Sequence, residues 1–98
     1  MFEIETLDNG YVAVSGRLDA AQAERAQTFL DQVEGEYAID MGALEYVSSA
    51  GLGVLLKAHK RLLQSGSGLR LVNVNSHIND IFRYSGFDRL FTIELAAG

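Results

Sequence analysis

The sequence predicts an α/β domain with a single mixed β-sheet, in which an opening antiparallel hairpin is followed by parallel strands packed by helices, in the order β-β-α-β-α-β-α-β. Three observations predict this fold class. Apolar and polar side chains alternate over residues 2–6, before Asn9-Gly10, and the mainly apolar residues 11–15 follow it. Asn-Gly favours a hairpin turn because both residues tolerate positive φ. Apolar residues then recur at helical spacing in three segments. Short apolar runs flank these segments, and strands joined through helices pair in parallel.

Five short segments are expected to form the strands. The first alternates apolar and polar side chains, which is typical of a strand with one buried face. The second follows the hairpin turn, and the third is a short apolar run that Asp40 interrupts. The five segments are residues 2–6, 11–15, 37–41, 69–74 and 90–93.

Three segments between these strands are expected to form helices, and their ends carry capping residues. Aspartate and serine accept hydrogen bonds from the free N–H groups of a first turn, and glycine adopts the positive φ that ends many helices. The first helix is expected to begin at Asp19, with Gln22 completing a capping box. It should end near Gly35, the second should run from Ser48 or Ser49 to residues 65–68, and the third from Ser76 to Gly86.

Composition indicates one binding module, residues 1–98, because two independent cores would not fit in 98 residues. Thirteen acidic against eight basic residues give a net charge of −5, which disfavours nucleic acid as a partner.

The chain has no cysteine, which excludes disulfides and thiolate metal sites. It has no apolar run of membrane-spanning length, and its first residues do not resemble a signal peptide. We therefore expect a cytoplasmic protein with no membrane insertion, no metal and no cofactor.

The most unusual stretch is residues 46–53, Tyr-Val-Ser-Ser-Ala-Gly-Leu-Gly. A glycine inside a helix costs about 1 kcal/mol relative to alanine, so two glycines at the start of an apolar helix call for a reason. That reason is a close approach of the backbone, either to the sheet or to a partner. A purely structural interpretation is that Ser48 or Ser49 caps the helix and that the glycines let the helix pack tightly.

Catalytic interpretations of this stretch fail on residue type and spacing. A nucleophile elbow needs Gly-x-Ser-x-Gly, and Val47 stands where the first glycine should be. His59 lies roughly 15 Å from Ser49 along the same helix, too far to act as its base. A phosphate-binding loop would need Gly-Lys-Ser/Thr, which is absent. We expect no catalytic residues and no enzyme activity.

A regulatory interpretation needs only an exposed hydroxyl. A serine at a helix N-terminus has a fixed backbone geometry and is easily presented to a kinase. Its phosphate would add roughly −1.5 to −2 charge, which the helix N–H groups accommodate. Such a switch would act by placing charge and bulk in the middle of a binding face.

Residues 39–56 resemble the signature of the STAS domain, the sulphate transporter and anti-sigma factor antagonist family. Gly16-Arg17-Leu18-Asp19 resembles the family's loop between the second strand and the first helix, and residues 86–91 resemble its closing stretch. The similarity covers nearly the whole chain and implies a STAS-like fold.

The resemblance implies a partner-switching protein. An unmodified antagonist of this family binds an anti-sigma factor, itself a serine/threonine kinase, and so frees a sigma factor. The kinase phosphorylates a serine at the start of the second helix and thereby ends the binding, and a serine phosphatase restores it. Ser49 occupies that position here. Ser48 stands where the family most often has aspartate, and it is a rival phosphorylation site.

We therefore expect an anti-sigma factor antagonist with a docking surface around Ser49. The alternative is a constitutive subunit of a signalling or lipid-transport complex, without a phosphorylation switch. Replacing Gly51 with a bulky residue is expected to weaken binding more than folding. The expected partner-binding residues are Arg17, Leu18, Asp19, Tyr46, Val47, Ser48, Ser49, Ala50, Gly51 and Leu52.

Overall fold

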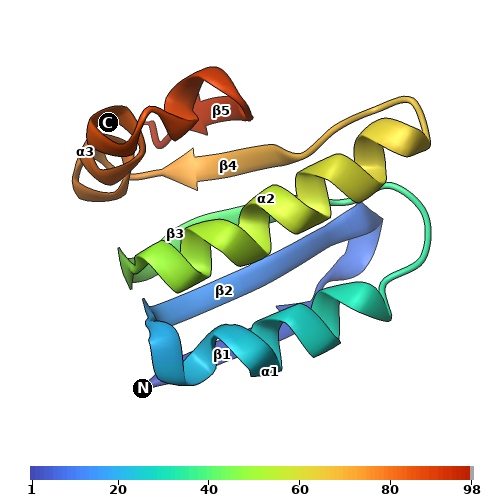
Figure 1. Ribbon diagram of the computed structural model, residues 1–98, viewed down its shortest axis with the longest axis horizontal. Coiled ribbons are helices and arrows are strands. Elements are labelled where there is room, and N and C mark those ends of the chain that lie inside the picture. The colour runs from blue at the N-terminus through green and yellow to red at the C-terminus, as the bar shows by residue number, and fades with distance from the viewer. Residues whose placement is uncertain (98) are drawn as a thin grey trace.

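The computed structural model describes residues 1–97 and contains one five-stranded sheet with the strand order β1-β2-β3-β4-β5 (Figure 1). β1 pairs antiparallel with β2, and every later pair is parallel. The predicted α/β class with a single mixed sheet is confirmed. The strands are β1 (Phe2–Thr6), β2 (Tyr11–Leu18), β3 (Ala38–Val47), β4 (Arg70–Val74) and β5 (Thr92–Leu95).

The helices lie on one face of this sheet. In Figure 1, α1 (Ala20–Asp31) and α2 (Ser49–Gln64) lie in front of the strands. α3 (Ser76–Ser85) is on the same side, because the Phe91 ring is edge-on both to His59 of α2, at 5.4 Å, and to Phe82 of α3, at 6.0 Å. The core fills the space between the helices and this face. None of these helices, within residues 1–97, has both the length and the apolar character that crossing a bilayer requires.

The hairpin turn and the core pattern follow the sequence expectations. Asn9 and Gly10 have φ values of 65° and 78°, which is the positive region that Asn-Gly was expected to supply. Val12 and Val14 of β2 point into the core and are at most 5% exposed. Burying a side chain of this size contributes about 1.5–3 kcal/mol, so these two valines favour the orientation in which their face of β2 meets the helices.

Three strands differ from their predicted bounds by more than one residue. β2 continues three residues past Ser15 and β3 six residues past Met41, because the two strands pair with each other up to Leu18 and Val47. β-bulges in this pair break the strict alternation of buried residues, so the extension was not visible as a pattern. β5 begins at Thr92, later than residue 90, because a 3₁₀ turn over Phe87–Arg89 precedes it.

Two helix ends also differ. α1 ends at Asp31, four residues before Gly35, where its free carbonyl groups meet a side chain from α2. Arg61 donates to the carbonyl oxygens of Leu30, at 2.9 Å, and of Val33. At the start of α3 the cap is Asn75 instead of Ser76, because the Asn75 side chain accepts from the Ile78 N–H at 2.9 Å.

Candidate functional site at the start of α2

Three helices begin at the same edge of the sheet. β2, β3 and β4 are parallel, and each is followed within two residues by α1, α2 and α3 respectively (Figure 1). A helix N-terminus carries roughly half a positive charge and free N–H groups. This edge therefore favours anions, and the serine motif lies at its centre.

Ser48 is the cap of α2. Its Oγ accepts from the Gly51 N–H at 3.2 Å, and its carbonyl oxygen accepts from the Leu52 N–H at 2.8 Å. Its own N–H donates to the carbonyl oxygen of Leu18 at 2.9 Å, so the cap is also fixed to the end of β2. These bonds decide between the two serines that the sequence offered as caps.

Ser49 has a different environment. It is the first residue of α2, and it is exposed to solvent, as is its neighbour Ala50. Because the capping bond to Gly51 comes from Ser48, the Ser49 hydroxyl is not engaged in holding the first turn. A hydroxyl in this position can be modified without removing the helix cap.

The two glycines of the motif serve different purposes. A Cβ on Gly51 would lie 2.8 Å from the Leu18 carbonyl oxygen, the Leu18 Cγ and the Val47 Cγ2. The close approach that the sequence predicted at this position is therefore to the sheet. A Cβ on Gly53 would meet nothing within 4 Å. The expectation that a bulky residue at position 51 weakens binding more than folding is wrong, because the helix could no longer pack on β2 and β3.

The structure divides the ten predicted partner-binding residues into two sets. Six are exposed or half-buried at the edge of the sheet, and four are buried beneath them. The buried residues form the floor that holds the surface in place and present no side chain to a partner. The surface set is Arg17, Asp19, Tyr46, Ser48, Ser49 and Ala50, and the buried set is Leu18, Val47, Gly51 and Leu52.

Side chains of β2 and β3 shape the rim of this surface. The Arg17 guanidinium lies over the Tyr46 ring, 4.5 Å from its centroid, and the two residues are register partners. Such a cation–π contact contributes about 0.5–1 kcal/mol when exposed. It also holds both side chains flat, so the rim has a defined shape. Both residues were predicted to bind a partner, but their pairing follows only from the register of β2 and β3.

Asp19 stands at the cap position of α1, but its carboxylate does not form the predicted capping bond. The Gln22 N–H donates to the backbone carbonyl of Asp19 at 3.1 Å, and no side-chain cap bond forms. Asp19 Oδ1 is shielded from solvent and has no hydrogen-bond partner within residues 1–97. An unsatisfied buried acceptor is costly, and because this oxygen is covered, a donor from outside can reach it only if the Asp19 side chain rotates.

His59 has a structural role. Its Nδ1 accepts from the Leu69 N–H at 3.0 Å, and its ring packs edge-on against Phe91. This bond ties α2 to the start of β4. The same ring is therefore committed to the fold at a place remote from Ser49.

Comparisons with known proteins identify the class of protein that this fold and site define. A family model described as "Mlab, STAS domain" matches residues 3–94, and the chain belongs to the STAS domain family. BtrV of Bordetella bronchiseptica, an anti-sigma factor antagonist by name, is 33% identical over 95 residues, which cover 92% of this chain and 82% of BtrV.

Solved structures show the same fold. TM1081 of Thermotoga maritima, described as an anti-sigma factor antagonist, gives a TM-score of 0.76 at 20% identity, over 95% of this chain and 85% of that one. The Bacillus cell-fate determinant SpoIIAA, in its phosphorylated form, gives 0.65 at 20% identity, over 95% of this chain and 90% of that one.

The different environments of the two serines predict different effects on stability. Ser48→Ala should lower the free energy of unfolding by about 1 kcal/mol, because it removes the capping acceptor. Ser49→Ala should change it by less than about 0.5 kcal/mol, as is usual for exposed positions. Urea denaturation of both variants measures the difference. A larger loss for Ser49→Ala than for Ser48→Ala would contradict the assignment of the cap.

Proposed function

We propose that the protein is a non-enzymatic anti-sigma factor antagonist that acts in the cytoplasm by partner switching. Its unphosphorylated form binds an anti-sigma factor that is a serine/threonine kinase. Phosphorylation of Ser49 by that kinase ends the binding, and a serine phosphatase restores it. The partner contacts the six surface residues around Ser49, and the four buried residues hold them in position.

The observation that carries this proposal is the separation of roles between the two serines. Ser48 caps α2, and Ser49 stands exposed at the first helical position. A kinase needs an accessible hydroxyl in a fixed geometry, and the free N–H groups of the first turn can accommodate the phosphate. Addition of the phosphate would then change the surface without unfolding the helix.

Two further observations support the proposal. BtrV, the relative with 33% identity, carries the name of an anti-sigma factor antagonist, and SpoIIAA has been solved in a phosphorylated form. The half-buried carboxylate of Asp19 places a negative charge next to the serine motif, which would attract a partner's arginine or lysine. A phosphate on Ser49 would add negative charge to the same edge and compete for that cation.

A second candidate function is that of a constitutive STAS subunit in a transport or signalling complex. The description of the matching family model as "Mlab, STAS domain" favours it, as does Ser48 in the position where the antagonist pattern most often has aspartate. In this case Ser49 would never be modified, and the partner would stay bound.

Phosphate mapping separates the two functions. The protein is incubated with the purified anti-sigma factor kinase and ATP, and the product is digested and mapped by mass spectrometry. We expect one phosphate, on Ser49, and none in the Ser49→Ala variant. Ser48→Ala is the matched control and should still be modified. Phosphate on Ser48 alone would overturn the site assignment, and failure to bind or to be modified would overturn the proposed function.

A further inference from the structure

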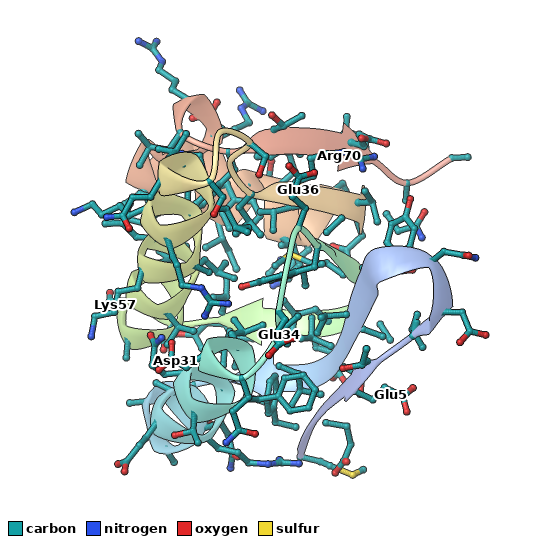
Figure 2. All side chains as sticks on the ribbon, turned by 90° about the vertical axis from the view of Figure 1, so that its right-hand side faces the viewer. Glu5, Asp31, Glu34, Glu36, Lys57 and Arg70 are labelled. Atoms are coloured by element: carbon teal, nitrogen blue, oxygen red, sulfur yellow. The ribbon has the colours of Figure 1, made fainter. Side chains whose placement is uncertain are left out.

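One face of the sheet has no covering layer within residues 1–97 (Figures 1 and 2). Parallel sheets almost always have both faces covered, yet the three parallel pairings here have helices on one side only. Ala38 and Val72 are 4% and 8% exposed and lie outside the core cluster. Their neighbours Ile39 and Leu71 point into the core, and successive side chains in a strand alternate in direction. Ala38 and Val72 therefore belong to this uncovered face, where neighbouring side chains bury them although no helix packs over them.

The uncovered face contains a hollow of about 510 Å³ between β1, β2 and β3. The register places its side chains in two rows across the strands. Glu5, Ala13 and Asp40 form one row, and Glu3, Ser15 and Ala43 form the other. The floor is therefore made of small side chains, which would let another polypeptide backbone come close.

The charge of this hollow is negative. Its lining, drawn from residues 1–97, contains three carboxylates and no basic side chain. Glu5 points away from the helices in Figure 2, and Glu3 has a long contact of 3.7 Å with the exposed guanidinium of Arg25. Such a surface pair contributes little, so the field over the hollow remains that of the acids.

Other cations on this face are already engaged. Arg70 donates to Glu94 at 2.7 Å, a hydrogen bond that holds the pKa of Arg70 above its usual value, and Arg17 lies on the Tyr46 ring. The molecule measures 29 × 26 × 24 Å, whereas charges are screened over about 8 Å at physiological salt. Charges at the far ends of the molecule therefore do not offset those of the hollow.

The occupant that fits is a cationic segment of a protein. Within residues 1–97, no three acidic or histidine side chains are arranged to hold a metal ion. Asp40 already accepts from the Gly42 N–H at 2.9 Å and from the Asn73 amide at 3.0 Å, which leaves Glu3 and Glu5 as the spaced carboxylates. Lysine and arginine side chains pair with such a set one at a time, while their backbone crosses the floor of small residues. Arg17 and Tyr46 lie at the edge of the same face and connect the hollow to the surface around Ser49.

We propose that the uncovered face docks a lysine- or arginine-rich segment of the anti-sigma factor kinase. The identity of the kinase rests on the proposed function, whereas the cationic character of the segment rests on the hollow alone. Complementary charge of this kind mainly raises the association rate and selects the partner. The kinase would then be held at two places, with one contact at Ser49 and the other across β1, β2 and β3.

Charge reversal tests the proposal. The double variant Glu3→Lys/Glu5→Lys is compared with Glu34→Lys/Glu36→Lys, in the loop between α1 and β3 (Figure 2). This loop precedes β3 and Ser49 follows β3, so the control lies at the opposite end of that strand from Ser49. Each reversal adds two charges, so both variants move the net charge from −5 to −1. We expect the affinity for the kinase to fall at least about tenfold in the first variant, chiefly in the association rate, and to change less than about twofold in the control.

The outcomes separate this inference from the proposed function. Equal affinities in the two variants, with Ser49 still phosphorylated, would overturn the second docking face and leave the switch intact. A wild-type protein that the kinase neither binds nor modifies would overturn both. Sedimentation of the free protein is measured in parallel. A wild-type dimer that Glu3→Lys/Glu5→Lys disperses would assign the face to a second copy of the chain and overturn the choice of partner.

Discussion

Replacing Gly51 with alanine is expected to lower the free energy of unfolding by about 3 kcal/mol, at the upper end of the usual cost of overpacking. The alanine Cβ would lie 2.8 Å from the Leu18 carbonyl oxygen and equally close to Val47 Cγ2. The backbone cannot move aside locally, because the Ser48 N–H is bonded to that same carbonyl oxygen. α2 would have to shift away from the ends of β2 and β3. Urea denaturation with a fitted midpoint measures the loss.

Gly53→Ala is the matched control, since it makes the same chemical change two residues further along α2. Nothing lies within 4 Å of the position its Cβ would occupy. The variant should gain about 1 kcal/mol, because alanine is the better helix former. The two substitutions should therefore change stability in opposite directions. A shared direction would mean that α2 does not pack on β2 and β3 as described.

The difference between the two glycines was partly readable from the sequence. Gly51, Leu55, Ala58 and Leu62 follow one another at helical spacing, and all four are buried. Extending the apolar stripe of the helix back to its first turn would have placed Gly51 against the sheet. Gly53 falls outside that stripe. The presence of two glycines in a helix predicted a close approach at both positions. Only the rotation of α2 about its axis shows that Gly51 faces the sheet and Gly53 does not.

The directions of strand pairing were predictable, but the lengths of the strands were not. The Asn9-Gly10 turn and the alternation before it predicted the hairpin, and the helices between the later strands predicted parallel pairing. β3, however, continues through Gly42, Ala43 and Glu45, which are exposed. Polar and small residues in this segment indicate the end of a strand, whereas pairing with β2 extends the strand to Val47. Tertiary pairing overrides local pattern in such segments.

The position of the site was visible in the sequence, but the roles of its two serines were not. Serine is a favoured cap at either position 48 or position 49. The choice follows from where β3 ends, because the bond from the Ser48 N–H to the Leu18 carbonyl fixes Ser48 outside the first turn. That bond joins residues thirty positions apart, and no local pattern reports it.

Ser49→Asp is expected to lower the affinity for the anti-sigma factor kinase by about 100-fold, and Ser49→Ala by less than about twofold. Alanine keeps the small volume at the centre of the surface, and the cap bond of Ser48 is untouched. Aspartate adds a second carboxylate that competes with Asp19 for the partner's cation, so one charge in the interface is left without a counter-ion, at a cost of a few kcal/mol. The charge also adds to that of Asp19 at the same edge.

The folding stability of the two variants should show the opposite trend. A carboxylate in the first turn of a helix is favoured by about 0.3–1 kcal/mol, so Ser49→Asp should unfold at the same or a higher temperature than Ser49→Ala. A loss of affinity therefore could not be explained by unfolding. Isothermal titration and thermal melting of the same preparations measure the two quantities.

Ser48→Asp completes the comparison, because it introduces the same charge one residue earlier. Aspartate caps a helix as well as serine does, so the Gly51 N–H keeps its acceptor and the helix should not lose stability. Its affinity for the kinase should stay close to that of the wild type, because the family most often has aspartate at this position. If Ser49→Asp and Ser49→Ala bind equally well, Ser49 is no switch. If Ser48→Asp loses as much affinity as Ser49→Asp, a negative charge at either position prevents binding. The result would then contradict a specific role for Ser49.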